Sequence, residues 1–417
     1  MWKKNMDASG MEPAQATRDG SVNAASAKPA TFSVTVYQRM QDVEHVWREL
    51  EHQAPATIYQ RFDFLDAWQS TLGVAAGVKP HIVVVKKEGR VVALLPFGVG
   101  KCAKVPTLGF LGGKHSNINI ALIHPDFYAS MPPATVKEIL REAISHDPAI
   151  AAVGLKNMPT VWDGLANPLA LNGCTSAASN LWLLPLEKDF ATLLERRRSG
   201  AKTAKGFRQK LNRLNNNFGT VEMIEAESFD QYAELIDTFL QQKLPWLEER
   251  GIKSDMTTPA FREFLLSLAE RSQGRTDGVI NIIGLKVGGK WVATCICASF
   301  QGCYSNYLTS LAADPVMNRS SPGELLQHKF LTRACETGHK IFEFGIGRTP
   351  QKERWLKAGE PMVDLYRPVS ARGMLLVSGL KLAQQAKRTL KENPALMSAI
   401  KTVREKLGGR RYVSGNE

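Results

Sequence analysis

The chain has 417 residues, of which 44% are hydrophobic and 22% are charged. Domains typically span about 100 to 200 residues, so the length predicts two domains, and the composition excludes a disordered or collagen-like chain. The apolar runs are strand-sized, and the N-terminus lacks the apolar core of a secretory signal, so we expect a cytoplasmic protein without a membrane span. The net charge of +13 indicates an acidic partner: nucleic acid, an anionic membrane surface or an anionic cofactor.

Residues 1–30 are rich in small and polar residues and predict a disordered tail, after which residues 31–185 predict a first lobe. Alternating apolar residues indicate strands and helical spacing indicates helices, with a turn at Gly89 between two apolar runs. The expected strands are 31–37, 81–85, 89–97, 118–123 and 151–155, and the expected helices are 42–52, 62–72 and 134–145.

Residues 186–218 interrupt this pattern with many basic residues and few acids, which predicts a basic helical linker. Its cations are Arg196, Arg197, Arg198, Lys202, Lys205, Arg208, Lys210 and Arg213. The stretch lacks the interleaved aromatic residues of a single-strand binder and any zinc signature, so nucleic acid is disfavoured as a partner.

Residues 219–370 repeat the element order of the first lobe and predict a second lobe. The expected strands are 220–224, 279–287, 290–300, 303–311 and 340–344, and the expected helices are 229–240, 258–271 and 322–337. Residues 371–417 predict a basic amphipathic helical tail.

Cysteine and histidine spacing indicates neither disulfides nor a metal site. Cys295 and Cys297 lie two residues apart in an expected strand, so their side chains share one face, and we interpret them as small buried thiols.

The loop between the strand ending at Leu311 and the following helix has the features of a phosphate site. Pro322 stands at an expected first helical position and Gly323 follows it, where free backbone N–H groups and the helix dipole attract anions. Ser320 or Ser321 is expected to cap the helix, with Glu324 completing a capping box. On these residues alone, an ordinary capped helix explains the pattern equally well.

A longer set of motifs resembles a known enzyme family. Residues 338–347 (GHKIFEFGIG) and 351–357 (QKERWLK) resemble the end of the CelD-type, Fem-related group of GNAT acetyltransferases. Residues 59–68 (YQRFDFLDAW), 92–97 (VALLPF) and 207–214 (FRQKLNRL) also fall in family order. Glu343 stands where the family usually has Asp, and Thr349 begins a run that lacks the family's tyrosine.

The resemblance implies an α/β fold with two tandem GNAT-like lobes, each a mixed, largely antiparallel sheet flanked by helices. It also implies acetyl-CoA or another acyl-CoA as co-substrate, with the pyrophosphate held by the loop before the helix. The expected cofactor-binding residues are Leu311, Arg319, Ser320, Ser321, Pro322 and Gly323.

Two residues are candidates for catalysis. Strand alternation points Glu343 away from Phe342 and Phe344, and partial burial would raise its pKa toward that of a general base. Tyr307 is a candidate to protonate the leaving thiolate. A plain ion pair of Glu343 with Lys340 or Arg348, and core packing of the tyrosine, are the competing interpretations.

His115, Lys352 and Trp355 are candidate substrate-binding residues, since a loop histidine can line a cleft and Trp355 offers a stacking face. Unspecialised loop positions are the alternative.

The expected function is acyl-CoA-dependent N- or O-acyl transfer to an amino sugar, glycan or similar small acceptor in envelope or exopolysaccharide metabolism, as the resemblance implies. A transfer-RNA-dependent Fem-like aminoacyltransferase and a non-catalytic glycan- or membrane-associated binding module stay open as alternatives. The basic tail suits peripheral contact with an anionic membrane.

Overall fold

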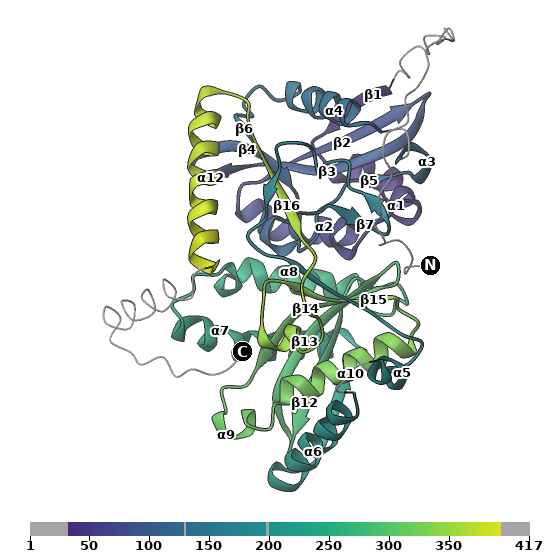
Figure 1. Cartoon of the computed structure of the whole chain (residues 1–417), viewed down its shortest axis with the longest axis vertical. Coiled ribbons are helices and arrows are strands. Elements are labelled where there is room, and N and C mark those ends of the chain that lie inside the picture. Colours follow the sequence, from purple (N-terminus) through teal and green to yellow (C-terminus); the bar gives the residue numbers. More distant parts are fainter. Residues whose placement is uncertain (1–31, 129–130, 197–199, 393–417) are drawn as a thin grey trace, which may run out of the picture.

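The computed structural model describes residues 32–128, 131–196 and 200–392. Two sheets, each flanked by helices, are stacked along the long axis of the molecule (Figure 1). The expected disordered tail at 1–30 and residues 393–417 of the expected basic tail lie outside the described residues. No helix in the described part is long and apolar enough to cross a membrane.

The first sheet has eight strands, in the order β1-β2-β3-β4-β6-β16-β9, with β5 paired to β3. Helices α1 and α2 cover one face with apolar side chains, and α4 covers the other. The bounds are β1 Phe32–Tyr37, α1 Glu44–Gln53, α2 Phe62–Trp68, β2 Lys79–Lys87, β3 Arg90–Cys102, β4 Val105–Phe110, β5 Leu122–Ile123, α3 Pro125–Tyr128, α4 Pro133–Ser145, β6 Ala152–Pro159, β9 Thr175–Ser176 and β16 Met362–Pro368. A small hairpin, β7 Val161–Trp162 and β8 Leu165–Ala166, stands apart from the sheet.

The second sheet has six strands, in the order β10-β15-β14-β13-β12-β11. Helices α7 and α8 cover the face that looks toward the first sheet, whereas α5, α6 and α10 cover the outer face. The bounds are β10 Leu181–Pro185, α5 Phe190–Glu195, α6 Gly200–Phe218, β11 Val221–Glu225, α7 Phe229–Glu249, α8 Pro259–Glu270, β12 Asn281–Val287, β13 Lys290–Phe300, β14 Cys303–Leu311, α9 Pro315–Asn318, α10 Pro322–Glu336, β15 Ile341–Ile346 and α11 Pro350–Glu353. The last helix, α12 Ala371–Glu392, returns to the first sheet.

The two halves of the chain exchange one strand each. β16 comes from the end of the second half but pairs with β6 in the first sheet, and β10 comes from the end of the first half but pairs with β15 in the second. In both sheets the donated strand lies antiparallel beside a parallel pair, β4 with β6 or β14 with β15. The expected lobe boundaries at residues 185 and 370 divide the chain by sequence alone. In the structure each sheet also contains one strand from the other side of such a boundary, β16 in the first sheet and β10 in the second.

Most expected strands and helices are present within a few residues of their predicted ends, and the α/β class with two mixed, helix-flanked sheets is confirmed. The strand expected at 118–123 is wrong in length, since only Leu122–Ile123 pairs. Cys295 and Cys297 are buried, free and on the same face of β13, with sulfur atoms 3.5 Å apart.

The lobes share one apolar core. Trp47 and Phe64 from the first half belong to the same buried cluster as Phe239, Phe261 and Phe264 from the second. Phe64 meets Phe264 edge to face, with ring centroids 5.6 Å apart. A continuous core of this kind fixes the relative position of the two sheets.

A buried carboxyl group near this core makes stability depend on pH. Glu51 is 1% exposed, and burial raises its pKa from 4.5 to about 7, although the Phe62 backbone N–H and the Arg61 charge oppose the shift. The folded state therefore binds the proton more tightly than the unfolded state, so we expect the free energy of unfolding to fall by about 3 kcal/mol between pH 4.5 and 7 from this group. Urea denaturation across this range should show that decline in the wild type and not in Glu51→Gln. An unchanged decline in the variant would contradict this assignment.

Candidate functional site

The second sheet opens into a fork between its two parallel strands. β14 and β15 pair only at Cys303 with Ile341, Tyr304 with Phe342 and Ser305 with Glu343. Beyond this point β14 continues to Leu311 and β15 to Ile346 without further pairing to each other. The fork therefore begins at Glu343.

Glu343 points away from Phe342 and Phe344, as strand alternation predicts. The two phenylalanines pack in the apolar cluster beneath α10, whereas Glu343 lies on the opposite face, toward the first lobe. It is completely buried, and burial raises its pKa, although hydrogen bonds from Ser305, Asn117 and Tyr59 oppose the shift. The expected alternative partners are absent from its described hydrogen bonds and ion pairs, and Arg348 pairs with Glu353 instead.

Three side chains hold the Glu343 carboxyl group, and two of them come from the first half of the chain. Ser305 Oγ donates to Oε2 at 2.5 Å, Tyr59 OH to Oε1 at 3.0 Å and Asn117 Nδ2 to Oε1 at 3.0 Å. Asn117 Nδ2 also donates to the Tyr59 hydroxyl at 2.7 Å. A carboxyl group with three such donors is fixed in position and can carry a charge despite its burial.

Sequence reasoning did not connect Tyr59, Asn117 or Ser305 with Glu343. Tyr59 and Asn117 are more than two hundred residues from Glu343 along the chain, and only the packing of the lobes brings them together. Ser305 lies directly opposite Glu343 in the strand register, so correct pairing of the two strands would have found it.

Tyr307 lies on the same side of the sheet as Glu343. Its ring meets those of Tyr59 and Phe64, at centroid distances of 6.1 and 5.8 Å. Its hydroxyl group is buried and has no hydrogen-bond partner in the described part of the chain. Burial raises the pKa of Tyr307, so the phenol keeps its proton and remains able to donate it.

His115 also lies between the lobes, but its imidazole ring is buried and paired with Asp255, so it does not face an open cleft. Its Nε2 atom is 2.9 Å from Asp255 Oδ2, and its ring packs on Phe261. Although burial opposes the shift, His115 and Lys114 lower the pKa of Asp255 to about 2, so this carboxylate is ionised.

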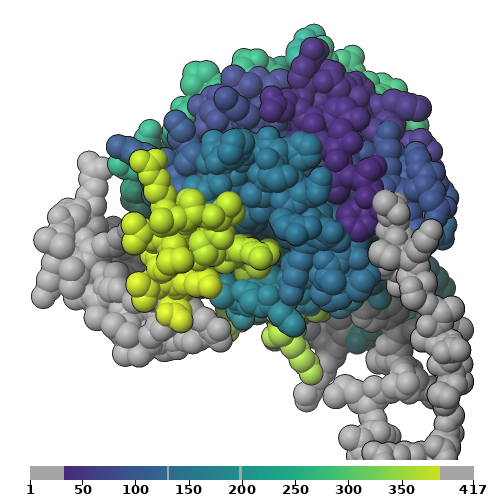
Figure 2. Space-filling model, turned by 90° about the horizontal axis from the view of Figure 1, so that it is seen from above, coloured from purple at the N-terminus to yellow at the C-terminus, as the bar shows by residue number. Residues whose placement is uncertain are grey.

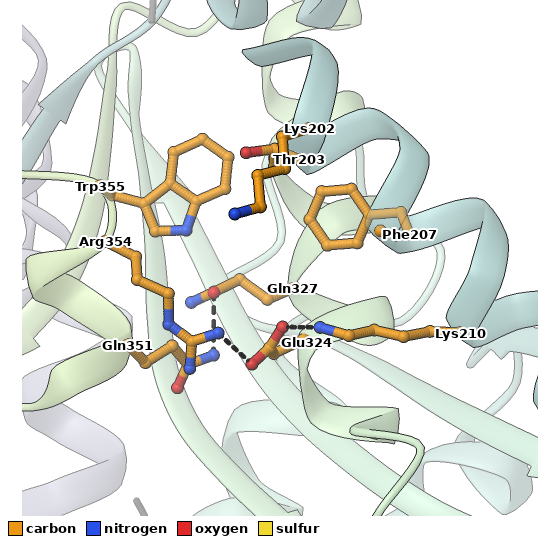
Figure 3. Close-up of a pocket in the computed structure, with 10 residues that line it drawn as sticks. Lys202, Thr203, Phe207, Lys210, Glu324, Gln327, Gln351, Arg354 and Trp355 are labelled. Carbon is orange, nitrogen blue, oxygen red and sulfur yellow. Dashed lines mark hydrogen bonds and ion pairs between the residues drawn. The ribbon is translucent and has the colours of Figure 1, made fainter. Parts of the chain in front are cut away.

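The other face of the second sheet carries a pocket of about 470 Å³, which we call the α10 pocket. It lies between α6, the first turns of α10 and the α11 segment, so the helices that follow the two fork strands both line it (Figure 3). Its lining residues are Lys202, Thr203, Gly206, Phe207, Lys210, Glu324, Gln327, Gln351, Arg354 and Trp355.

Charge and aromatic surface alternate around this pocket. Lys202, Lys210 and Arg354 supply cations, and Phe207 and Trp355 supply aromatic faces on opposite sides. Glu324 pairs with both Lys210 and Arg354, and although burial opposes ionisation, these cations lower the pKa of its carboxyl group. Lys202 forms no ion pair among the described residues, so the pocket keeps positive charge for an anion.

The loop expected to hold phosphate lies beside the pocket rather than within its lining. Ser321 is the N-cap residue of α10 and Pro322 its first residue, as predicted. The expected capping box is wrong: Ser321 has a left-handed backbone (φ 54°), its side chain makes no capping bond, and Glu324 is held by Lys210 and Arg354.

The remaining loop residues are divided between core and surface. Ser320 is buried, Arg319 is exposed, and Leu311 lies against Gly323, where an added Cβ would be 3.1 Å from Leu311 Cδ2. The backbone N–H groups of Glu324 and Leu325 already bond to the Ser321 carbonyl, so Gly323 is the residue of this turn with an N–H left for a ligand.

Lys352 and Trp355 have different surroundings. Trp355 lines the α10 pocket and packs near Phe344. Lys352 does not line it: its ammonium group donates to the Ile346 and Gly347 carbonyls at 2.9 and 3.0 Å. Burial lowers the pKa of Lys352 to about 8, although the Glu343 charge opposes this. In the described part of the chain no cluster of three metal-ligating side chains occurs.

Comparisons with known proteins found one matching family model and several matching folds. Residues 201–353 match the family model described as an acetyltransferase (GNAT) domain. A search of curated protein sequences found no match.

Solved structures share the fold at low sequence identity. FemX is 10% identical, with a TM-score of 0.54 over 82% of this chain and 99% of its own. The C-terminal domain of a putative lysylphosphatidylglycerol synthetase from Agrobacterium fabrum is 12% identical, with a TM-score of 0.51 over 82% of this chain and 97% of its own. A tandem GNAT protein from the clavulanic acid biosynthesis pathway is 12% identical, with a TM-score of 0.45 over 81% and 98%. Residues 201–353 therefore match a GNAT acetyltransferase domain, and they lie within an α/β structure of two mixed sheets.

Proposed function

We propose that the chain transfers an acyl group from an acyl-CoA to an amine or hydroxyl group of an amino sugar, glycan or similar small acceptor in envelope or exopolysaccharide metabolism. One observation carries the transfer reaction: a cationic, aromatic pocket and a buried carboxyl group lie on opposite faces of the same fork. A donor held on one side can thus present its acyl group through the fork to an acceptor on the other. The acceptor class rests on the resemblance of residues 338–357 to the CelD-type group.

In this proposal the α10 pocket and the Gly323 N–H hold the cofactor. The three cations face its phosphate groups, and Trp355 or Phe207 stacks on its adenine ring. A lining with three cations, one carboxylate and two aromatic faces suits a nucleotide with several phosphates better than it suits a neutral ligand.

Glu343 and Tyr307 then handle the two protons of the reaction. The acceptor nitrogen or oxygen attacks the thioester carbonyl, the new C–N or C–O bond forms, and the C–S bond breaks. The acceptor proton passes to Glu343 through the hydroxyl group of Ser305, which already donates to the carboxyl group. Both side chains are buried, so the acceptor must reach them through the fork. The Tyr307 phenol, which has no other described partner, returns a proton to the leaving thiolate.

Titration calorimetry of acetyl-CoA and longer acyl-CoAs tests the cofactor site. We expect micromolar binding to the wild type and its loss in Gly323→Asp, because the added carboxylate repels phosphate where α10 begins. Gly323→Asn is the matched control: it has the same shape against Leu311 without the charge, and it should retain most of the binding. Equal weakening by both variants would show that crowding and not charge is responsible, and no binding to the wild type would overturn the cofactor assignment.

A transfer-RNA-dependent aminoacyl transfer is a second candidate, because α6 exposes Lys205, Arg208 and Arg213 to solvent beside the pocket. Such a reaction would stop after ribonuclease treatment and would not need acyl-CoA. Activity that survives ribonuclease and requires acyl-CoA would exclude it.

A further inference from the structure

Helix α12 has one face packed on the first sheet and one face open. On the packed side, Val377 is buried, and Gln384 donates to the Ser176 carbonyl at 2.6 Å. Gly373 lies so close to the Ala151 carbonyl that an added Cβ would be 1.7 Å from its oxygen. These contacts fix the orientation of α12 and therefore fix which residues it turns outward.

The outward face carries several large apolar side chains. Met374 is 60% exposed, Leu375 79% and Leu382 67%, and Val369, just before the helix, is 42% exposed. The spacing of 374, 375 and 382 places these side chains within one arc of the helix. We call these four residues the α12 outer face. In Figure 2 the yellow segment that contains α12 lies on the outside of the molecule.

Positive charge surrounds this apolar face. Arg372 and Lys381 are exposed on α12 itself. A groove of about 560 Å³ adjoins its first turn, between α4 and residues 367–369, and contains the exposed cations Lys137, Arg141 and Arg367. The one acidic residue in its lining, Glu138, already pairs with Arg141 at 3.3 Å. The C-terminal sequence is also rich in positive charge, since residues 371–417 contain ten Lys or Arg and three Glu.

Exposed leucine and methionine ringed by cations match the surface of an anionic bilayer. The apolar side chains can enter the boundary between headgroups and acyl chains while the cations meet lipid phosphates. We propose that the α12 outer face and the adjacent basic groove bind the chain to the surface of an anionic phospholipid membrane. The helix lies on the membrane and does not cross it.

Two other occupants fit the surface less well. A second copy of the chain in a two-fold dimer would bring the same cations against each other, which opposes association. Single-stranded nucleic acid gains its affinity from stacking on aromatic rings, and the α12 outer face has none. The proposal concerns binding alone and does not rest on the acyltransferase reaction.

Vesicle flotation with the full chain tests the proposal. We expect the protein to float with phosphatidylcholine vesicles that contain phosphatidylglycerol and to remain unbound with pure phosphatidylcholine. The variant Leu375→Gln/Leu382→Gln should bind the anionic vesicles about tenfold more weakly or worse, because two inserted leucines are lost. Arg141→Gln/Arg367→Gln should also weaken binding, and added salt should weaken it in the wild type.

Matched controls remove exposed residues of the same kinds elsewhere on the first lobe. Val74→Gln/Val161→Gln replaces valines that are 64% and 51% exposed, and Arg39→Gln replaces an arginine whose side chain is 75% exposed. These variants should float like the wild type. Absent binding, equal binding to neutral vesicles, or equal losses in the controls would overturn the proposal. So would a dimer in sedimentation that dissociates in the leucine variant, because a second copy would then cover this face.

Discussion

Glu343→Gln is expected to lower kcat for acyl transfer by about 100- to 10,000-fold, the range over which a positioned general base contributes. Glutamine keeps the shape of the side chain, and its carbonyl oxygen can still accept from Ser305 Oγ, whereas its amide NH2 group faces the Tyr59 and Asn117 donors. Circular dichroism of the variant checks that the fold is retained. Glutamine cannot accept the acceptor's proton. Binding of acyl-CoA on the opposite face should remain within a few-fold of the wild type.

The pH dependence separates a base from a structural carboxyl group. Glu343 must be ionised to act, so kcat/KM should rise with pH through its raised pKa. Tyr59→Phe removes one donor that stabilises the ionised form, which raises that pKa further and moves the rise to higher pH. Tyr232→Phe, which loses a hydroxyl bonded to the Ile280 carbonyl, is the control and should leave the profile unchanged.

Glu51→Gln is the matched control for the loss of a buried carboxyl group. It also removes a carboxyl group from the core between the lobes, but Glu51 has no described contact with the fork. Its transfer rate should equal that of the wild type. Full activity in Glu343→Gln, or an equal loss in Glu51→Gln, would refute the role of Glu343 as the base.

Local patterns in the sequence predicted much of the fold. Apolar runs bounded by turns identified β12, β13 and β14 almost to the residue, and helical spacing identified α4, α8 and α10. The helices bury one face each, whereas β12 and β13 are buried on both faces, so continuous apolar runs mark these strands. Pro322 marked the start of α10 correctly because its fixed φ suits a first helical turn.

The features that were missed depend on long-range packing. β16 is seven residues long and pairs with a strand about two hundred positions earlier, which no local pattern indicates. The Glu343 site has the same cause, because Tyr59 and Asn117 reach it only across the interface between the lobes. The direction of Glu343 followed from alternation, but its partners did not.

The phosphate-site motif in the sequence indicated the region of the α10 pocket but did not identify the residues that line it. The phosphate-site motif ends at Gly323, whereas the pocket is completed by Lys202, Phe207 and Lys210 of α6. The sequence predicts only a basic helical linker here, because residues 186–218 carry many cations and few acids. The structure places its partly buried side on α10, where Lys210 pairs with Glu324.

Arg61→Met is expected to lower the free energy of unfolding by about 3 to 5 kcal/mol, the cost of removing one partner from a buried ionic network. Arg61 is 1% exposed and joins the two halves of the chain: its Nη1 donates to the Asp277 carbonyl at 2.7 Å. Its guanidinium also lies 3.8 Å from Asp63 Oδ2 and 3.9 Å from Glu51 Oε1. Without it, the buried carboxyl groups of Glu51 and Asp63 lose a positive neighbour, and among the described residues only Asp63 keeps other arginine partners, Arg48 and Arg275.

The control is Arg262→Met, which breaks a pair with Asp237 that is at least as well bonded, at 2.7 and 3.0 Å, but partly exposed. An exposed pair contributes about 1 kcal/mol or less, so this variant should unfold within that range of the wild type. Urea denaturation of both variants measures the difference, and equal losses would show that burial of Arg61 adds nothing.

The loss in Arg61→Met should itself depend on pH. Glu51 already has a pKa of about 7, and removal of the nearby positive charge raises it further, so the variant keeps this group protonated over a wider range. Below the pKa of the unfolded chain, the Glu51 carboxyl group is neutral in the folded and the unfolded state, so the Arg61 charge matters less. At higher pH the wild type gains stability from the pair of ionised Glu51 with Arg61, and the variant does not. The destabilisation should therefore grow from pH 5 to pH 8, and a double variant with Glu51→Gln should lose that growth. A loss that stays constant with pH would show that the pair with Glu51 adds nothing and that Arg61 stabilises the interface through Asp277 and Asp63.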